Sequence, residues 1–129
     1  MSELSSKGTI LVIEDDLEFQ QTVKNFLECS GYGVCAFSDA MKALEFFAEN
    51  PVDVVVTDLM LPGKDGLEAM LDILESRPQT TVIAMSGAAT GNPRWLPCAE
   101  LLGARRTFEK PFQLSDLVSE IDEIITKAS

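Results

Sequence analysis

Short apolar segments rich in β-branched residues alternate with segments of helical period along almost the whole chain. The apolar segments have the length of strands, whereas the segments between them repeat hydrophobic residues every three or four positions, as amphipathic helices do. The expected strands are TILVI (9–13), YGVCAF (32–37), VDVVVT (52–57), TVIAM (81–85) and RTFE (106–109). The expected helices carry Phe19, Val23, Phe26 and Leu27 with a stop at Gly31; Met41, Leu44 and Phe47; Leu67, Met70, Leu71 and Leu74; and Leu117, Ile121, Ile124 and Ile125 after a cap at Ser115.

This alternation predicts a parallel sheet with helices on both faces. Parallel neighbouring strands need crossover connections, and these are usually helical and right-handed. Residues 9–13, 52–57 and 81–85 are nearly continuous apolar runs, as expected of central strands that are covered on both sides. In such open sheets, ligands bind beyond the carboxyl ends of the strands, so the polar residues at those ends are the first candidates for a site.

Length and composition predict one globular domain. The chain has 129 residues, of which 46% are hydrophobic and 24% charged, and a chain of this length buries roughly two thirds of its unfolded surface. We expect a polar lead at 1–7, one domain at 8–126 and a tail at 127–129. No apolar run approaches the roughly 20 residues that span a bilayer, and the start MSELSSKG lacks a signal-peptide core. We therefore expect a cytoplasmic protein without membrane contact.

The charge and the reactive residues narrow the chemistry. A formal net charge of −11 argues against nucleic-acid or anionic-membrane binding by this domain and favours cations and basic partners. Cys29, Cys35 and Cys98 form no CxxC pair, so we expect reduced and mostly packed thiols rather than a metal cluster or disulfide framework. The chain has no histidine, the commonest general base and metal ligand. Any chemistry must therefore use carboxylates, hydroxyls and lysine.

Four of the expected strands end in a hydrophilic group. Taken alone, an acidic pair before a helix is usually an N-cap, and a single Asp, Ser or Lys at a strand end means little. Capping alone does not explain why hydrophilic groups should follow four strands at the same edge of one sheet. The residues concerned are Glu14, Asp15 and Asp16 after the first strand, Asp58 after the third, Ser86 after the fourth and Lys110 after the fifth.

Carboxylates that converge at one edge need a cation. Two of them about 4 Å apart repel by roughly 4 kcal/mol at an effective dielectric constant near 20. A hard, oxygen-preferring ion fits this set, and few carboxylates with open water positions suit Mg²⁺ better than Ca²⁺. Lys110 adds a second positive charge, so the site is suited to a phosphoryl group, with Asp58 as nucleophile and Ser86 as a hydrogen-bond donor.

Four motifs resemble those of the response-regulator receiver domain of two-component signalling, a CheY-like family. They are ILVIEDD (10–16), VTDLMLPGKDG (56–66), IAMSGAA (83–89) and GARRTFEKPF (103–112), in the family's order and covering nearly the whole chain. The resemblance implies a flavodoxin-like, three-layer, doubly wound fold with strand order 2-1-3-4-5. It also implies a phosphoprotein that takes a phosphoryl group from a histidine kinase or a histidine phosphotransfer protein and acts on a downstream protein or an output domain in a phosphorelay.

The resemblance further implies a role for each residue of the site. Asp58 would be the phosphoacceptor, Ser86 the switch hydroxyl and Lys110 the phosphate-binding lysine. Mg²⁺ would be ligated by Asp15, Asp58 and the backbone carbonyl of Met60, with Glu14 acting largely through water. Asp16 would cap the first helix, Pro62 and Gly66 would shape the loop after Asp58, and the bond between Lys110 and Pro111 would be cis.

The chain departs from the family pattern in the region that responds to phosphorylation. Thr107 stands where receivers usually carry an inward-turning aromatic residue, and Phe108 points to the opposite face, where core packing is the expected role. Arg105 and Arg106 either meet an acidic partner or are simply solvated.

Residues 89–102 form the second departure. Gly91, Pro93 and Pro97 would interrupt a regular helix, so we expect the fourth helix to begin late, near Pro97. Trp95 in the preceding loop either anchors a partner or covers the core.

Two other functional classes remain compatible with the residues. Phosphatases of the haloacid dehalogenase type also use a strand-end aspartate, but they carry a second acid two residues later, where this chain has Met60. A degenerate receiver that only binds a partner is the other alternative, against which the complete set of acids, serine and lysine argues.

Overall fold

The computed structural model describes residues 6–59, 66–87 and 99–128. Five parallel strands form one sheet in the order β2-β1-β3-β4-β5. The elements are β1 (Thr9–Ile13), α1 (Leu17–Cys29), β2 (Gly33–Phe37), α2 (Ala40–Glu49), β3 (Val54–Asp58), α3 (Gly66–Ser76), β4 (Thr81–Gly87), β5 (Arg106–Lys110) and α5 (Leu114–Ala128). Residues 99–101, just before β5, are also helical.

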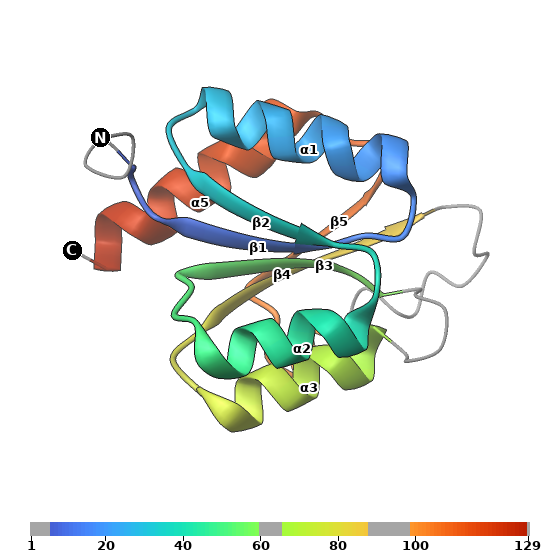
Figure 1. Ribbon diagram of the computed structural model, residues 1–129. Coiled ribbons are helices and arrows are strands. Elements are labelled where there is room, and N and C mark those ends of the chain that lie inside the picture. Colours follow the sequence, from blue (N-terminus) through green and yellow to red (C-terminus); the bar gives the residue numbers. More distant parts are fainter. Residues whose placement is uncertain (1–5, 60–65, 88–98, 129) are drawn as a thin grey trace.

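The helices lie in two layers, one on each face of the sheet. Helices α1 and α5 cover one face, and α2 and α3 cover the other (Figure 1). The predicted doubly wound parallel sheet and its strand order are therefore confirmed. None of the helices within the described ranges is both long enough and apolar enough to cross a bilayer.

The core is divided between the two faces because side chains of a strand alternate. In β1, Ile10 and Val12 pack in the cluster under α1 and α5, whereas Leu11 and Ile13 pack in the cluster under α2 and α3. Strand β3 is buried along its full length. This double burial explains why its sequence is a continuous apolar run rather than an alternating one.

The helix boundaries follow local capping chemistry. The Asp16 side chain accepts hydrogen bonds from the backbone N–H groups of Glu18 and Phe19, which confirms Asp16 as the N-cap of α1. After α1, Gly31 has a φ of 103°, a conformation that favours glycine, so the expected stop is confirmed. At α5 the helix begins at Leu114, so Ser115 lies inside its first turn and is not the N-cap that we expected.

Three hydrophobic residues expected on buried helix faces are exposed. They are Phe26, Met41 and Leu71, with exposed fractions of 39%, 53% and 38%. The helices turn smaller residues inward instead, such as Ala43 and Ala69. The expectation of packed thiols is wrong for Cys29, which is exposed, whereas Cys35 is half-buried. Cys98, Trp95 and Pro97 lie outside the described residues.

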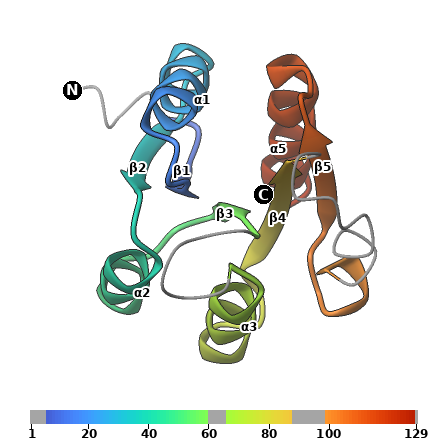
Figure 2. The same ribbon diagram turned by 90° about the vertical axis from the view of Figure 1, so that its right-hand side faces the viewer.

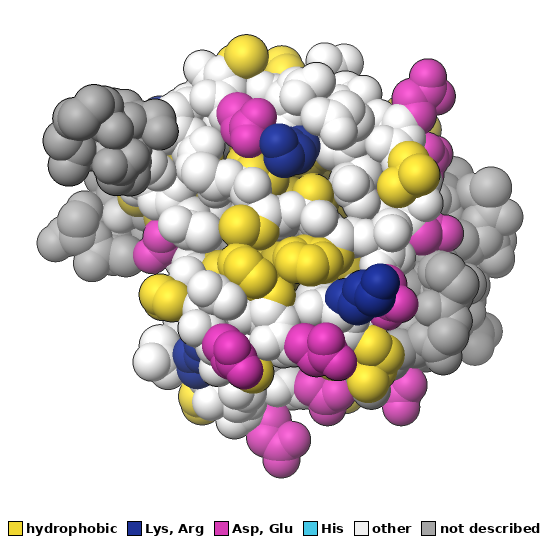
Figure 3. All heavy atoms as spheres, in the orientation of Figure 1, with side chains coloured by type: hydrophobic (Ala, Val, Ile, Leu, Met, Phe, Trp, Pro, Cys, Tyr) yellow, Lys and Arg dark blue, Asp and Glu magenta, His cyan; other side chains and the backbone are white. Residues whose placement is uncertain are grey.

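One edge of the sheet gathers the carboxyl ends of all five strands. This edge lies at the right of Figure 1, and Figure 2 views the molecule from that side. Seen from the β2 side, a band of hydrophobic side chains crosses the middle of the molecule, with charged side chains on the helices above and below it (Figure 3).

Candidate functional site

Three carboxylates meet at the carboxyl edge of the central strands. Glu14 and Asp15 follow β1, and Asp58 ends the neighbouring β3. One carboxylate oxygen of each residue lies within 4.8 Å of the other two. Glu14 and Asp58 are buried, with exposed fractions of 0% and 5%, whereas Asp15 is exposed. The group is therefore anchored in the protein and open to solvent on one side.

Lys110, the last residue of β5, reaches across to two of these acids. Its Nζ atom donates to Glu14 Oε1 at 2.7 Å and to Asp58 Oδ2 at 2.8 Å. The following bond to Pro111 is cis, as the resemblance implied. Charge-assisted bonds of this length are strong, and one ammonium here binds two buried carboxyl groups.

Burial and pairing shift the pKa values of Glu14 and Lys110. Burial raises the pKa of Glu14 to about 7, helped by the negative charge of Asp58 and opposed by hydrogen bonds from Lys110 and the Asp16 N–H. Burial lowers the pKa of Lys110, but its bonds to Asp58 and Glu14 outweigh that effect and leave the pKa above its ordinary value. The Lys110 ammonium is therefore charged at neutral pH, and the pKa of Glu14 lies above its ordinary value because of burial.

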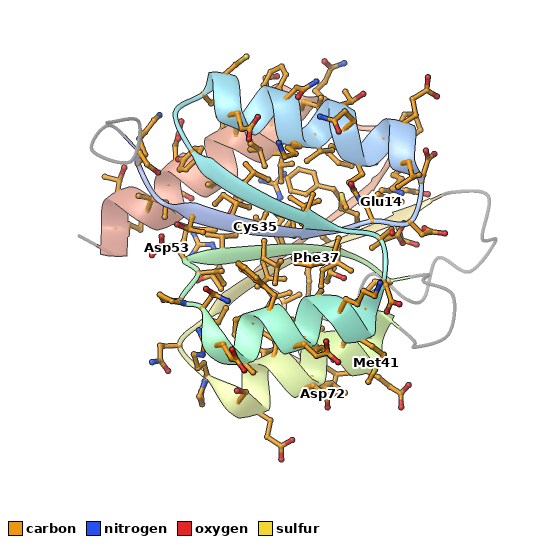
Figure 4. The ribbon with its side chains drawn as sticks, viewed as in Figure 1. Glu14, Cys35, Phe37, Met41, Asp53 and Asp72 are labelled. Carbon is orange, nitrogen blue, oxygen red and sulfur yellow. The ribbon has the colours of Figure 1, made fainter. Side chains whose placement is uncertain are left out.

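The backbone fixes Glu14 in place. Its N–H donates to the Phe37 carbonyl at 2.9 Å, and its own carbonyl accepts a bond from the Gln20 side chain at 2.8 Å. Its carboxylate Oε2 accepts the N–H of Asp16 at 3.0 Å. Figure 4 shows Glu14 at the carboxyl end of the sheet, whereas Asp53 lies at the opposite end, where it accepts the Thr9 N–H. The two acidic positions therefore have different roles.

Asp58 is fixed by the chain that follows it. The N–H of Leu59 donates to the Met85 carbonyl at 2.9 Å, and the N–H of Gly66 donates to the Leu59 carbonyl at 3.1 Å. A Cβ atom at Gly66 would lie 2.2 Å from the Asp58 carbonyl oxygen. Only glycine leaves room for this approach, which gives the Gly66 of the motif a physical reason. Met60 and Pro62 lie outside the described residues.

Ser86 occupies the corresponding edge of β4. It is buried, with an exposed fraction of 3%, and follows Met85, the residue paired with Asp58. On the other side, β4 pairs with β5 so that Ser86 lies beside Glu109, next to Lys110. The fold thus brings Glu14, Asp15, Asp58, Ser86 and Lys110 to one edge of the sheet.

Thr107 and its neighbours at positions 105, 106 and 108 have partners within the chain. Thr107 donates from its hydroxyl to Glu100 at 2.9 Å. Phe108 is buried in the core, as expected. Both Arg105 and Arg106 bind Glu120 of α5, each at 2.9 Å, so neither is merely solvated.

One residue near the site was missed by the sequence analysis. The ring centroid of Phe19, in the first turn of α1, lies 4.7 Å from Lys110 Nζ. Phe19 was assigned to the hydrophobic face of its helix, and it does pack against the core. Its position within the first helical turn after the acidic residues was the signal that places it beside the site.

Comparisons with known proteins agree with the fold described above. The family model described as the response regulator receiver domain matches residues 10–122. The response regulator receiver protein CpdR of Brucella abortus is 30% identical over 119 residues, which cover 92% of this chain and 98% of that protein. The transcriptional regulatory protein FixJ of Bradyrhizobium diazoefficiens is 30% identical, with 97% of this chain and 60% of FixJ covered. CpxR of Escherichia coli is 31% identical, with 92% and 50% covered.

Solved structures give the same fold. A response regulator receiver domain protein from Clostridium thermocellum has a TM-score of 0.86 and 31% identity, covering 93% of this chain and 95% of that one. The receiver domain of the Francisella response regulator 1452 has a TM-score of 0.83 and 27% identity, covering 95% and 99%. The chain thus spans nearly all of CpdR and these two structures, but only 60% of FixJ and half of CpxR.

Proposed function

This chain belongs to the response-regulator receiver family of two-component signalling, and from that premise we propose that it is a Mg²⁺-dependent phosphoacceptor switch with Asp58 as its nucleophile. The observation that carries the proposal is the bridge from Lys110 to Glu14 and Asp58, with the Asp15 carboxylate within 4.8 Å of both acids. An ammonium and three carboxylates at one sheet edge supply the charges that phosphoryl transfer needs.

The reaction is a displacement at phosphorus. An Asp58 carboxylate oxygen attacks the phosphoryl group of a phosphohistidine on a histidine kinase or phosphotransfer protein. The new O–P bond forms as the N–P bond breaks, and the imidazole leaves with the bonding pair and takes up a proton. Lys110 is placed to hold a phosphoryl oxygen, because its ammonium already lies 2.8 Å from Asp58 Oδ2.

The donor set fits Mg²⁺. All three acidic groups offer carboxylate oxygens, which this ion prefers, and Asp15 is exposed, so water can complete the coordination. Asp15 and Asp58 would hold the ion, together with the Met60 carbonyl that the family pattern adds, and Glu14 would act through water. When bound, the ion supplies positive charge that offsets the negative phosphoryl oxygens.

Phosphorylation would change the charge at the centre of the sheet edge. An acyl phosphate carries more negative charge and more acceptor oxygens than the carboxylate it replaces. Ser86 and Lys110, on β4 and β5, are the groups that would be drawn towards it, and β5 bears Thr107, which contacts Glu100. The surface around residues 99–110 would then be read by a downstream protein or an output domain.

A phosphorylation assay tests this proposal. Incubation with acetyl phosphate and Mg²⁺ is expected to add one phosphoryl group, in an acid-stable and base-labile linkage, and Asp58→Asn is expected to abolish it. Asp53→Asn is the matched control, because Asp53 lies at the other end of β3 and its amide can still accept the Thr9 N–H. An adduct that persists in Asp58→Asn, or that forms equally well without a divalent ion, would refute the assignment.

A further inference from the structure

The ammonium of Lys110 has a third partner besides the two carboxylates. The Phe19 ring centroid lies 4.7 Å from Nζ, within the range in which a cation is attracted to the face of an aromatic ring. The Lys110 side chain has an exposed fraction of only 20%, so this attraction is less screened than on an open surface. Lys110 is therefore held by two acids on one side and by a ring on another.

Phe19 is held at its backbone by Asp16 and at its ring by Phe112. The N–H of Phe19 is bound by the Asp16 cap, which fixes the start of α1 directly after the acidic residues. The ring makes an edge contact with Phe112, with centroids 5.9 Å apart and planes at 86°. Phe112 in turn contacts Phe108 at 5.0 Å. An aromatic cluster thus joins the first turn of α1 to β5 on the two sides of Lys110.

The ring differs from the carboxylates in one chemical respect. It carries no titratable group, binds no Mg²⁺ and cannot be phosphorylated, so phosphoryl transfer leaves its own chemistry unchanged. The carboxylate of Asp58, by contrast, changes its charge and geometry when it becomes an acyl phosphate.

We propose that Phe19 is a positioning residue that keeps the Lys110 ammonium in place for the incoming phosphoryl group. This inference rests on the proposed function of Asp58 and adds to it the element that constrains the lysine. The Phe19 ring lies against the Lys110 ammonium, so we expect Phe19 to act through Lys110.

Graded fluorination of the ring tests this directly. Phe19 is replaced by phenylalanine analogues with one, two or three fluorines, which weaken the attraction for a cation while leaving the ring shape nearly unchanged. We expect the rate of phosphorylation by acetyl phosphate, at saturating Mg²⁺, to fall stepwise, and Phe19→Leu to be about three- to tenfold slower. Phe19→Tyr, which keeps a ring, is expected to restore most of the rate. Mg²⁺ affinity is expected to stay constant across the series.

The control variant is Phe26→Leu, the same change seven residues further along α1 at an exposed position. Rates that do not follow the fluorine series, or a Phe19→Tyr variant as slow as Phe19→Leu, would overturn the proposal.

A second measurement does not depend on phosphorylation. In a double-mutant cycle of Phe19→Leu and Lys110→Met without Mg²⁺, the unfolding equilibrium constants are expected to be non-additive by about three- to tenfold. Additive effects would show that ring and ammonium do not interact and would end the inference. If the unmodified chain formed no adduct while the cycle showed coupling, the proposed function would fail and the contact between the two side chains would stand.

Discussion

Replacing Gly66 by alanine is expected to damage both stability and phosphorylation. The added Cβ would lie 2.2 Å from the Asp58 carbonyl oxygen and 2.6 Å from Leu59 Cα, whereas Cβ contacts under 3.0 Å are essentially never seen. The backbone must move by about 0.8 Å to reach even that limit, and no flexible side chain can absorb the shift, because both contacts are backbone atoms. The movement strains the bond from the Gly66 N–H to Leu59 and displaces the residue that carries the nucleophile.

The expected cost follows from these two effects. Overpacking at a rigid contact costs about 1–3 kcal/mol, and the weakened hydrogen bond adds about 1 kcal/mol, so the free energy of unfolding should fall by about 3 kcal/mol. For a chain of this length that lowers the thermal midpoint by roughly 10 °C, measured by circular dichroism. The phosphorylation rate should fall at least about tenfold, since misplacing a reacting group by an ångström has effects of that order or larger.

Gly33→Ala is the matched control. Its Cβ would lie 3.6 Å from Ser6 Oγ and 3.8 Å from the Gly8 carbonyl, which are ordinary contacts. We expect its stability to stay within about 1 kcal/mol of the unmodified chain, with any change in the stabilising direction. A Gly66→Ala variant as stable and as active as Gly33→Ala would show that the chain at Gly66 does not pack against the end of β3, and the reasoning about how Asp58 is held would be refuted.

Three further outcomes are expected. The pKa of Glu14 is raised from 4.5 to about 7, so between these pH values the folded state holds a proton that the unfolded state releases. The free energy of unfolding should therefore fall as the pH rises through this window, by up to about 3 kcal/mol. Denaturant titrations at pH 5 to 8 should show this fall, and Glu14→Gln should remove it. Glu120→Gln should lower the free energy of unfolding by about 1–2 kcal/mol at neutral pH, because the carboxylate joins two arginines. Glu28→Gln, in the exposed pair with Lys24, should lower it by less than about 0.5 kcal/mol. Equal losses would contradict the difference in burial between the two pairs. Asp16→Ala and Asp39→Ala should each lower the free energy of unfolding by about 1 kcal/mol, because each removes an N-cap. Only Asp16→Ala should also slow phosphorylation, because it loosens the segment that carries Glu14 and Asp15. A slower reaction in both variants would point to a general loss of stability.

Much of the fold could be predicted from hydrophobic periodicity, because the pattern of apolar residues depends on whether one or both faces of an element are buried. The strand at residues 9–13 was predicted to the residue, and the others to within about two positions, as double-sided burial demands apolar runs. Helix faces were predicted less well. Met41 was expected in the core, but α2 buries Ala40 and Ala43 instead. Small residues allow a helix to pack closely against the sheet, and a prediction based on hydrophobicity alone does not take side-chain size into account.

The site shows the same division between local and long-range information. The acids, serine and lysine were found because strand ends in a parallel sheet must meet at one edge, so positions along the chain sufficed. The roles of Arg105 and Arg106 were not foreseen, because the partner Glu120 lies on α5 and the register of that helix against β5 is a tertiary property. The contact between Phe19 and Lys110 escaped notice for the same reason, as it joins residues at opposite ends of the chain.

The most direct measurement is to locate the phosphoryl group chemically. Protein treated with acetyl phosphate and Mg²⁺ is reduced with borohydride, which converts an aspartyl phosphate to homoserine, and the product is sequenced by tandem mass spectrometry. We predict homoserine at position 58 and unmodified aspartate at positions 15, 16 and 53. Homoserine at another position, or none in protein shown to be folded and bound to Mg²⁺, would contradict the assignment of Asp58 as the nucleophile.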